Sequence, residues 1–129
     1  MVPGTSTGAP SRLPRPTREN RVRKRAEYLE IQGSGARVNG DCLVFILLRR
    51  PPGSPLRLGI TASRKIGGAV QRSRARRLIR EGFRAVFSEL PSALDIVVIV
   101  RRPLGDRKME AVLAEWQKAL PRIRQRSGS

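Results

Sequence analysis

Apolar residues recur at intervals of three and four in two long segments of the chain, the spacing of one face of an α-helix. The first segment runs from Ala69 to Leu90 and is followed by Pro91, and the second runs from Asp106 to Leu120 and is followed by Pro121. Because proline interrupts the hydrogen bonds of a helix, we expect helices over 69–90 and 106–120, with Asp106 as the N-cap of the second. The apolar positions are Ala75, Ile79, Phe83, Val86 and Leu90, then Met109, Val112, Leu113, Trp116 and Leu120.

Three shorter apolar patterns are typical of β-strands. Leu43 to Leu48 is an unbroken apolar run, which favours a strand buried on both faces. Leucine and isoleucine alternate with other residues from Leu56 to Ile60, as in a half-buried strand. Asp95 opens a third run, Ile96 to Val100, that is rich in β-branched residues.

The two ends of the chain carry no such pattern. Residues 1–20 contain mostly Pro, Gly, Ser, Thr and Arg and are predicted to form a disordered basic tail, and residues 127–129 a frayed C-terminus. Residues 21–126 are predicted to form one domain, which begins with a short helix from Arg25 to Gln32 that Gly33 and Gly35 end. The order helix, strands, helix, strand, helix indicates a mixed sheet with helices, in the α+β or α/β class.

The charge of the chain points to its partner. The 129 residues include 27 Lys and Arg but only 10 Asp and Glu, which gives a net charge of +17. A domain this basic repels itself, and a polyanion relieves the repulsion. We therefore expect a nucleic acid as the partner, since phosphate contacts supply most of the affinity in such complexes.

The composition also excludes several classes of function. The sequence has no histidine and no cluster of cysteines or carboxylates, so we expect no catalytic residue, no metal bound by the protein and no small-molecule substrate. Its single cysteine, Cys42, beside an apolar run, is interpreted as a half-buried structural thiol of a reducing compartment. The longest apolar run is far shorter than the ~20 residues of a membrane span, and the N-terminus lacks a signal-peptide pattern. We therefore expect a cytoplasmic protein that binds no membrane.

Basic residues concentrate at the start of the first long helix. Seven arginines lie between Arg64 and Arg84, and Glu81 is the single acid among them. A merely solvated helix face normally mixes the two signs of charge. At about 100° per residue, four of these arginines share one flank of the helix, beside the apolar stripe, and can meet phosphates: Arg76, Arg77, Arg80 and Arg84.

This region resembles the signature of the bacterial ribonuclease P protein family. The matching string is Leu58-Gly59, Ser63-Arg64-Lys65, Gly67-Gly68-Ala69-Val70, Arg72-Ser73-Arg74, Arg76-Arg77, Leu78-Ile79, Arg80-Glu81 and Phe83. Weaker matches are Arg21, Tyr28, Gly35, Asp95 and Arg101. The resemblance implies an α/β sandwich in which a mixed four-stranded sheet carries three helices. It also implies a left-handed β-α-β crossover, as in the second domain of ribosomal protein S5.

The resemblance further implies two RNA-binding surfaces. Tyr28, Ile46 and Arg21 would line a cleft, between the first helix and the sheet, for the single-stranded 5′ leader of precursor tRNA; packing in the core is the alternative role of Tyr28. The second surface would dock on the catalytic RNA and comprise Arg64, Lys65, Arg72, Ser73, Arg74, Arg76, Arg77 and Arg80.

The sequence departs from the family pattern at two positions. Ser73 replaces the family's asparagine, and a local helix cap is its alternative role. Gln32 replaces the second aromatic residue of the leader cleft.

The function implied by this resemblance is that of a noncatalytic protein subunit of ribonuclease P. The RNA subunit, with magnesium ions held by that RNA, would hydrolyse precursor tRNA. The partners would be the catalytic RNA and precursor tRNA. The alternative is a ribosomal protein or a general RNA chaperone, which would not prefer a precursor over its mature tRNA.

Overall fold

Four strands form one mixed sheet in the order β1–β2–β4–β3, in a computed structural model that describes residues 15–128. The central strands β2 (Leu43–Arg49) and β4 (Leu94–Val100) are antiparallel, and β1 (Ala36–Asn39) pairs antiparallel with the outer side of β2. Strand β3 (Arg57–Thr61) is parallel to β4, and the helix α2 (Ala69–Val86) connects the two. This connection is the β-α-β crossover that the resemblance implied.

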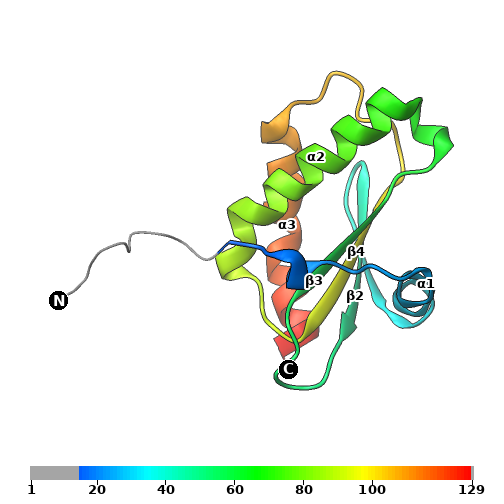
Figure 1. The fold of residues 1–129 in the computed structure, drawn as a ribbon. Coiled ribbons are helices and arrows are strands. Elements are labelled where there is room, and N and C mark those ends of the chain that lie inside the picture. The colour runs from blue at the N-terminus through cyan, green and yellow to red at the C-terminus, as the bar shows by residue number, and fades with distance from the viewer. Residues whose placement is uncertain (1–14, 129) are drawn as a thin grey trace.

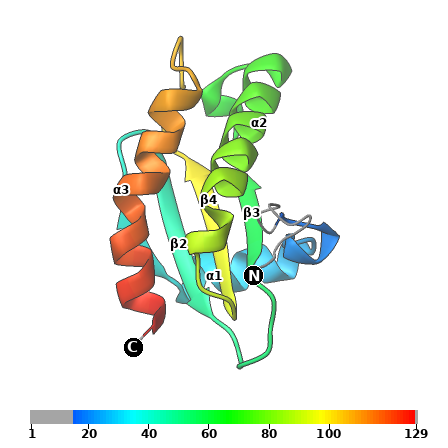
Figure 2. The same ribbon diagram turned by 90° about the vertical axis from the view of Figure 1, so that its left-hand side faces the viewer.

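Helices cover both faces of the sheet (Figures 1 and 2). Helices α2 and α3 (Met109–Gly128) lie on one face, and α1 (Arg25–Ser34) lies on the other. Phe45 of β2 packs in the cluster under α2 and α3, whereas its neighbours Val44 and Ile46 pack under α1. Both sides of β2 are therefore buried, which confirms the prediction from its unbroken apolar run.

Helix α3 differs from the prediction at both ends. It begins at Met109, because residues 104–107 form a turn in which the Arg107 amide donates to the Leu104 carbonyl and Gly105 has a φ of +60°. Asp106 is therefore not its N-cap. Pro121 does not end the helix, since this residue is exposed and the carbonyl that it leaves unbonded can meet water, while buried Leu120 and Ile123 hold the helix to the core. Ser127 and Gly128 are helical rather than frayed, and Ser129 lies outside the described residues.

The other two helices follow the prediction closely. Helix α1 includes Gly33 and ends at Ser34, with Gly35 as its C-cap. Helix α2 ends at Val86, and one 3-10 turn (Phe87–Glu89) continues the chain to Leu90. Within residues 15–128, no helix combines the length and the hydropathy that crossing a bilayer demands.

The folded unit begins earlier than predicted. Of the predicted tail, residues 1–14 lie outside the described residues, but residues 15–22 form an ordered strap along the outer edge of β3 (Figure 1). The strap contains a short 3-10 helix (Arg18–Asn20) capped by Thr17. Asn20 Nδ2 donates to the Leu56 carbonyl at 2.6 Å, and the Val22 amide donates to the Leu58 carbonyl at 3.0 Å. These bonds occupy backbone groups at the edge of the sheet.

A charged network ties α1 to the two parallel strands. Asp95 is fully buried, and both of its oxygens accept from Arg57, at 2.8 and 2.7 Å. The remaining nitrogen of Arg57, Nη1, donates to Glu27 of α1 at 2.9 Å. The hydrogen bond from Arg57, with backbone donors at Lys24 and Arg23, lowers the pKa of Glu27 to about 2, and the two carboxylates raise the pKa of Arg57.

Helices α2 and α3 approach each other at a glycine. A Cβ atom on Gly82 would lie 2.3 Å from Cδ1 of Trp116, so only glycine admits this ring. The Trp116 indole is fully buried, donates to the Ile79 carbonyl at 3.2 Å and meets Phe45 edge to face. The apolar face that the spacing predicted for this helix is therefore buried at Trp116.

We predict that Glu27→Gln lowers the free energy of unfolding by about 1–3 kcal/mol at pH 7, because a charge-assisted bond to Arg57 is lost. The folded-state pKa of Glu27 lies below its unfolded value of 4.5, so this contribution is present above pH 4.5 and disappears as the pH falls toward 2. Denaturant unfolding of both proteins across that range should show the difference shrinking. Glu30→Gln, at an exposed position of the same helix, serves as the control. A constant difference across the range would contradict the assignment.

We also predict opposite effects of two glycine-to-alanine changes within helices. Gly33→Ala should stabilise by about 0.5–1 kcal/mol, because open space surrounds the new methyl group and alanine favours a helix. Gly82→Ala should destabilise by about 1–3 kcal/mol despite the same helix preference, because the methyl group overlaps the Trp116 ring. Thermal unfolding of the two variants measures this directly. If both changes stabilised the protein, the contact between α2 and α3 would have to rearrange to admit the methyl group at position 82.

Candidate nucleic-acid interface

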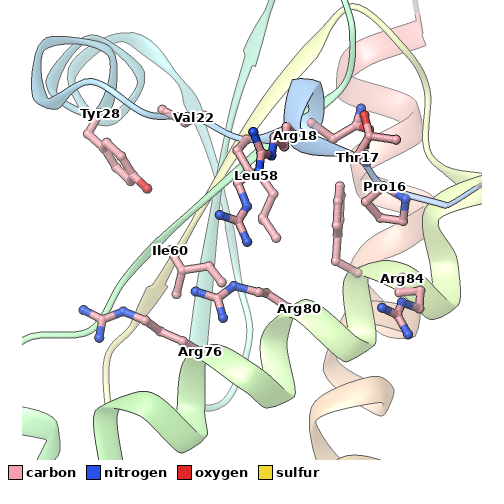
Figure 3. Close-up of a pocket in the computed structure, with 13 residues that line it drawn as sticks. Pro16, Thr17, Arg18, Val22, Tyr28, Leu58, Ile60, Arg76, Arg80 and Arg84 are labelled. Atoms are coloured by element: carbon pink, nitrogen blue, oxygen red, sulfur yellow. Dashed lines mark hydrogen bonds between the residues drawn. The ribbon is translucent and has the colours of Figure 1, made fainter. Parts of the chain in front are cut away.

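A groove of about 640 Å³ lies between α2 and the strap (Figure 3). Leu58 and Ile60 of β3, with Phe83 of α2, give it apolar surface. Figure 3 shows Arg76 and Arg80 reaching from α2 toward the cavity, with Tyr28 opposite them on α1. The groove therefore combines an apolar floor with polar walls contributed by distant parts of the chain.

The charge of the groove has one sign. Five arginines and no acidic residue line it: Arg18 and Arg21 from the strap, and Arg76, Arg80 and Arg84 from α2. The three on α2 are four residues apart, which places them about 6 Å apart along the helix. Within residues 15–128, none of the five side chains takes part in an ion pair. The groove can therefore hold a ligand that carries regularly spaced negative charges.

Tyr28 can lie in the groove because Gly59 of β3 has no side chain. A Cβ atom on Gly59 would lie 2.6 Å from Cε1 of the Tyr28 ring, so the ring lies directly against the strand backbone. The preceding residue, Glu27, anchors α1 to Arg57. The ring is half-buried, and its hydroxyl has no hydrogen-bond partner in the part of the chain that the structure describes. Tyr28 can thus offer both a π-face and a polar group to a ligand.

The structure joins residues that the sequence assigned to two separate surfaces. Arg76 and Arg80, predicted to contact the catalytic RNA, line the same groove as Tyr28 and Arg21, predicted to contact the leader. Ile46 does not line this groove, because it is only 1% exposed and packs beneath α1. An unbroken apolar strand gives no sign of which side chains face a cleft.

Other predicted residues lie around α2 but outside the groove. Arg64 and Lys65 are exposed in the 3-10 turn Arg64–Ile66 that precedes the helix. Arg77 points outward and pairs with Glu81 at 3.2 Å. Arg74 lies on the opposite flank and donates to the carbonyls of the 104–107 turn.

The remaining two predicted residues lie in the first turns of α2. Arg72 is partly buried, and its Nε atom lacks a partner among the described residues. Ser73 is exposed, and the N-cap of α2 is Gly68, five residues earlier, so Ser73 does not cap this helix. At the second position that departs from the family pattern, Gln32 Nε2 donates to the Thr61 hydroxyl at 3.4 Å and links α1 to β3.

Sequence reasoning missed the contribution of the strap. Arg18 lines the groove, but it lies in the segment predicted to be disordered. A local signal was present, because Thr17 and Asn20 have the spacing of a reciprocal cap and do hydrogen-bond to each other. Arg84 was placed by helical spacing on the flank of α2 that can meet phosphates, but it was not assigned to either of the two surfaces that the resemblance implied.

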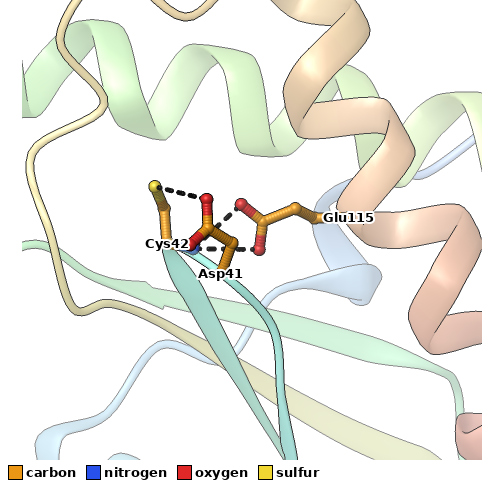
Figure 4. Close-up of side chains that lie close together, drawn as sticks. All are labelled: Asp41, Cys42 and Glu115. Carbon is orange, nitrogen blue, oxygen red and sulfur yellow. Dashed lines mark hydrogen bonds between the residues drawn. The ribbon is translucent and has the colours of Figure 1, made fainter.

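Asp41, Cys42 and Glu115 bring three potential metal-ligand atoms together (Figure 4), but their surroundings do not fit a divalent cation. Glu115 already accepts from the backbone amides of Cys42 and Leu43, at 3.0–3.2 Å. Asp41 faces two arginines at 3.4 Å. Burial raises the pKa of the Cys42 thiol, which disfavours the thiolate that a metal needs. We interpret the cluster as a link between α3 and the β1–β2 turn.

Comparison with known proteins gives one consistent result. The model of the family described as Ribonuclease P matches residues 17–124. The ribonuclease P protein component of Gluconacetobacter diazotrophicus is 36% identical over 104 residues, which cover 80% of this chain and 90% of that protein. The component from Desulfovibrio desulfuricans is 38% identical over 109 residues, covering 82% and 84%.

Solved structures agree with the sequence relatives. The RNase P protein of Thermotoga maritima is 31% identical, with a TM-score of 0.72 over 80% of this chain and 96% of that one. The Staphylococcus aureus RNase P protein is 31% identical, with a TM-score of 0.71 over 79% and 93%. The fold, the ordered string around α2 and these matches together show that the chain belongs to the ribonuclease P protein family.

Proposed function

We propose that this chain acts as the protein subunit of ribonuclease P in the 5′ maturation of tRNA, and that its groove holds the single-stranded leader of the precursor. The observation that carries the proposal is the groove itself, which is lined by five arginines, no acid and the half-buried ring of Tyr28. Single-stranded RNA needs this combination, because its phosphates are regularly spaced anions and its bases are free to stack.

The groove can bind an extended strand with little dependence on sequence. Arg76, Arg80 and Arg84 would meet successive phosphates along α2. Arg18 and Arg21 would contact the RNA from the opposite side, where the strap lies. The Tyr28 ring would receive one base. Because every base has a π-face, such a contact selects for the presence of a leader rather than for its sequence.

The outward surface of α2 would dock on the catalytic RNA. Arg64, Lys65 and Arg77 are exposed there and do not line the groove, so they remain available while a leader is bound. In this arrangement α2 contacts both RNAs, one on each side. The protein would thereby hold the precursor against the RNA that cleaves it.

Hydrolysis in this proposal is the work of the RNA subunit, with magnesium ions held by that RNA. The protein would contribute positive charge and would position the precursor. Both effects raise the local concentration of precursor tRNA at the catalytic RNA, and they make the enzyme prefer precursor tRNA over mature tRNA. The partners are RNAs, and the proposed setting is the cytoplasm.

One experiment tests the proposed function directly. Purified chain should increase cleavage of precursor tRNA when it is added to ribonuclease P RNA at low magnesium, and it should lower the KM for precursors that carry a leader. An equal gain in affinity for precursor tRNA and for mature tRNA would indicate a general RNA chaperone instead.

We predict that Arg80→Gln weakens binding of a single-stranded RNA oligonucleotide more than Arg77→Gln does. Both variants lose one positive charge from α2, but only Arg80 lines the groove, whereas Arg77 is already paired with Glu81. The slope of log affinity against log salt should fall by about 0.7 for Arg80→Gln. Fluorescence anisotropy at several salt concentrations measures both quantities. Equal losses would show that net charge, not the groove, sets the affinity.

We predict that Tyr28→Leu lowers the affinity of the assembled enzyme for precursor tRNA and leaves its affinity for mature tRNA unchanged. Leucine keeps apolar bulk against Gly59 but removes the π-face, which is worth about 1–3 kcal/mol per stacked base. In the family pattern a second aromatic residue lines the leader cleft, and this chain has Gln32 at that position. We therefore expect the loss of binding free energy to be about 1 kcal/mol, the lower end of that range. Tyr28→Phe is the control, since it keeps the ring. Equal losses of affinity for precursor and mature tRNA would show that the role of Tyr28 is purely structural.

A further inference from the structure

A second groove, of about 550 Å³, lies at the opposite edge of the sheet from the leader groove, between β1 and α3. Val38 and Asn39 of β1 form one wall, and α3 forms the other. Strand order β1–β2–β4–β3 puts two strands between this groove and β3, where the leader groove lies. One short stretch of RNA therefore cannot occupy both grooves.

Three cations on α3 follow this second groove. Lys118, Arg122 and Arg126, which we call the basic flank, are exposed and recur every four residues, about 6 Å apart along the helix. In the described part of the chain, none of the three has an ion pair or a side-chain hydrogen bond. By contrast, Arg124, on the other side of the same helix, donates to the Glu89 carbonyl at 3.0 Å and pairs with its carboxylate.

The acids near the basic flank are already engaged. Glu115 accepts from the amides of Cys42 and Leu43, and Asp41 pairs with Arg102 and Arg107. They therefore leave the cations of α3 unneutralised, and the flank remains a row of unpaired positive charge. Such a row repels itself until an anion binds.

The chemistry of the groove favours the backbone of double-helical RNA. Three of the α3 residues that line the groove are alanines, Ala111, Ala114 and Ala119, and between the charged side chains these small residues let a polymer backbone approach closely. No aromatic residue lines the groove, so it offers nothing for unpaired bases to stack on. A membrane surface fits poorly, because the exposed large apolar residues of the described chain, Leu29 and Val70, lie on α1 and α2.

We infer that the basic flank of α3 is a second RNA-binding site, which takes the phosphate backbone of a helical segment of the catalytic RNA. This inference rests on the proposed function for the identity of that RNA. Helices α2 and α3 cover the same face of the sheet, so an RNA docked on the outer surface of α2 can continue across α3 (Figure 2). The leader, held at the far edge, stays clear of this contact.

The test compares two substitutions that remove the same charge from the same helix. Arg122→Gln should weaken binding of a blunt-ended RNA duplex by the full-length chain roughly five- to tenfold at about 0.1 M salt, and should reduce the salt slope by about 0.9. Arg124→Gln, on the other side of α3, should leave both nearly unchanged. Thermal unfolding confirms that each variant is folded before binding is measured.

Two further arms separate this inference from the proposed function. Arg122→Gln should weaken assembly with ribonuclease P RNA but spare binding of a single-stranded oligonucleotide, whereas Arg80→Gln should show the reverse preference for the two short probes. Equal duplex losses for Arg122→Gln and Arg124→Gln would overturn the site. Unchanged assembly with the catalytic RNA would overturn its assignment to that RNA. If Arg122→Gln instead abolished binding of a poly-glutamate peptide and spared the duplex, the flank would be a protein-binding surface.

Discussion

The buried ion pair between Arg57 and Asp95 determines where the functional elements lie. A buried carboxylate requires compensation, and Asp95 accepts two hydrogen bonds from the planar guanidinium of Arg57, while Arg50 lies 3.5 Å away as a second cation. This geometry is possible only if β3 and β4 keep the parallel register in which these two residues are direct neighbours. The third bond of Arg57 reaches Glu27 and fixes α1 over the same strands. The Tyr28 ring lies against Gly59 because α1 is held at that point.

The charge of the proposed RNA-binding groove opposes the stability of the free protein. The five arginines of the leader groove repel one another, and its lining holds no acid to offset them. The fold tolerates this repulsion because the apolar stripe of α2 is buried against α3, with Trp116 at the closest approach, and because the strap is hydrogen-bonded to β3. In the proposed function, an RNA strand in the groove would replace this repulsion by charge-assisted hydrogen bonds. Relief of this repulsion would then contribute to the free energy of the proposed binding.

Periodicity in the sequence was enough to predict the main helices and strands, because their apolar faces are long. It failed where structure depends on distant partners. Strand β1 has four residues and no clear alternation, and it is set by pairing with β2. Pro121 continues α3 because Leu120 and Ile123 are buried around it, which no local rule reveals. The site shows the same division: α2 displays its arginines by helical spacing, whereas Ile46 does lie on the α1 face of the sheet but is buried under that helix, and an unbroken apolar strand does not reveal which of its residues stay exposed.

Helix α2 also explains why one short segment carries most of the family resemblance. Its buried side must admit Trp116 at Gly82, its groove flank must present Arg76 and Arg80, and its other flank uses Arg74 to hold the turn before α3. A helix with three different neighbours leaves few positions free to vary, since a change on one side moves the other two. Packing and the proposed RNA binding are therefore coupled through a single helix. A substitution at the contact between α2 and α3 would shift the groove arginines without touching any of them.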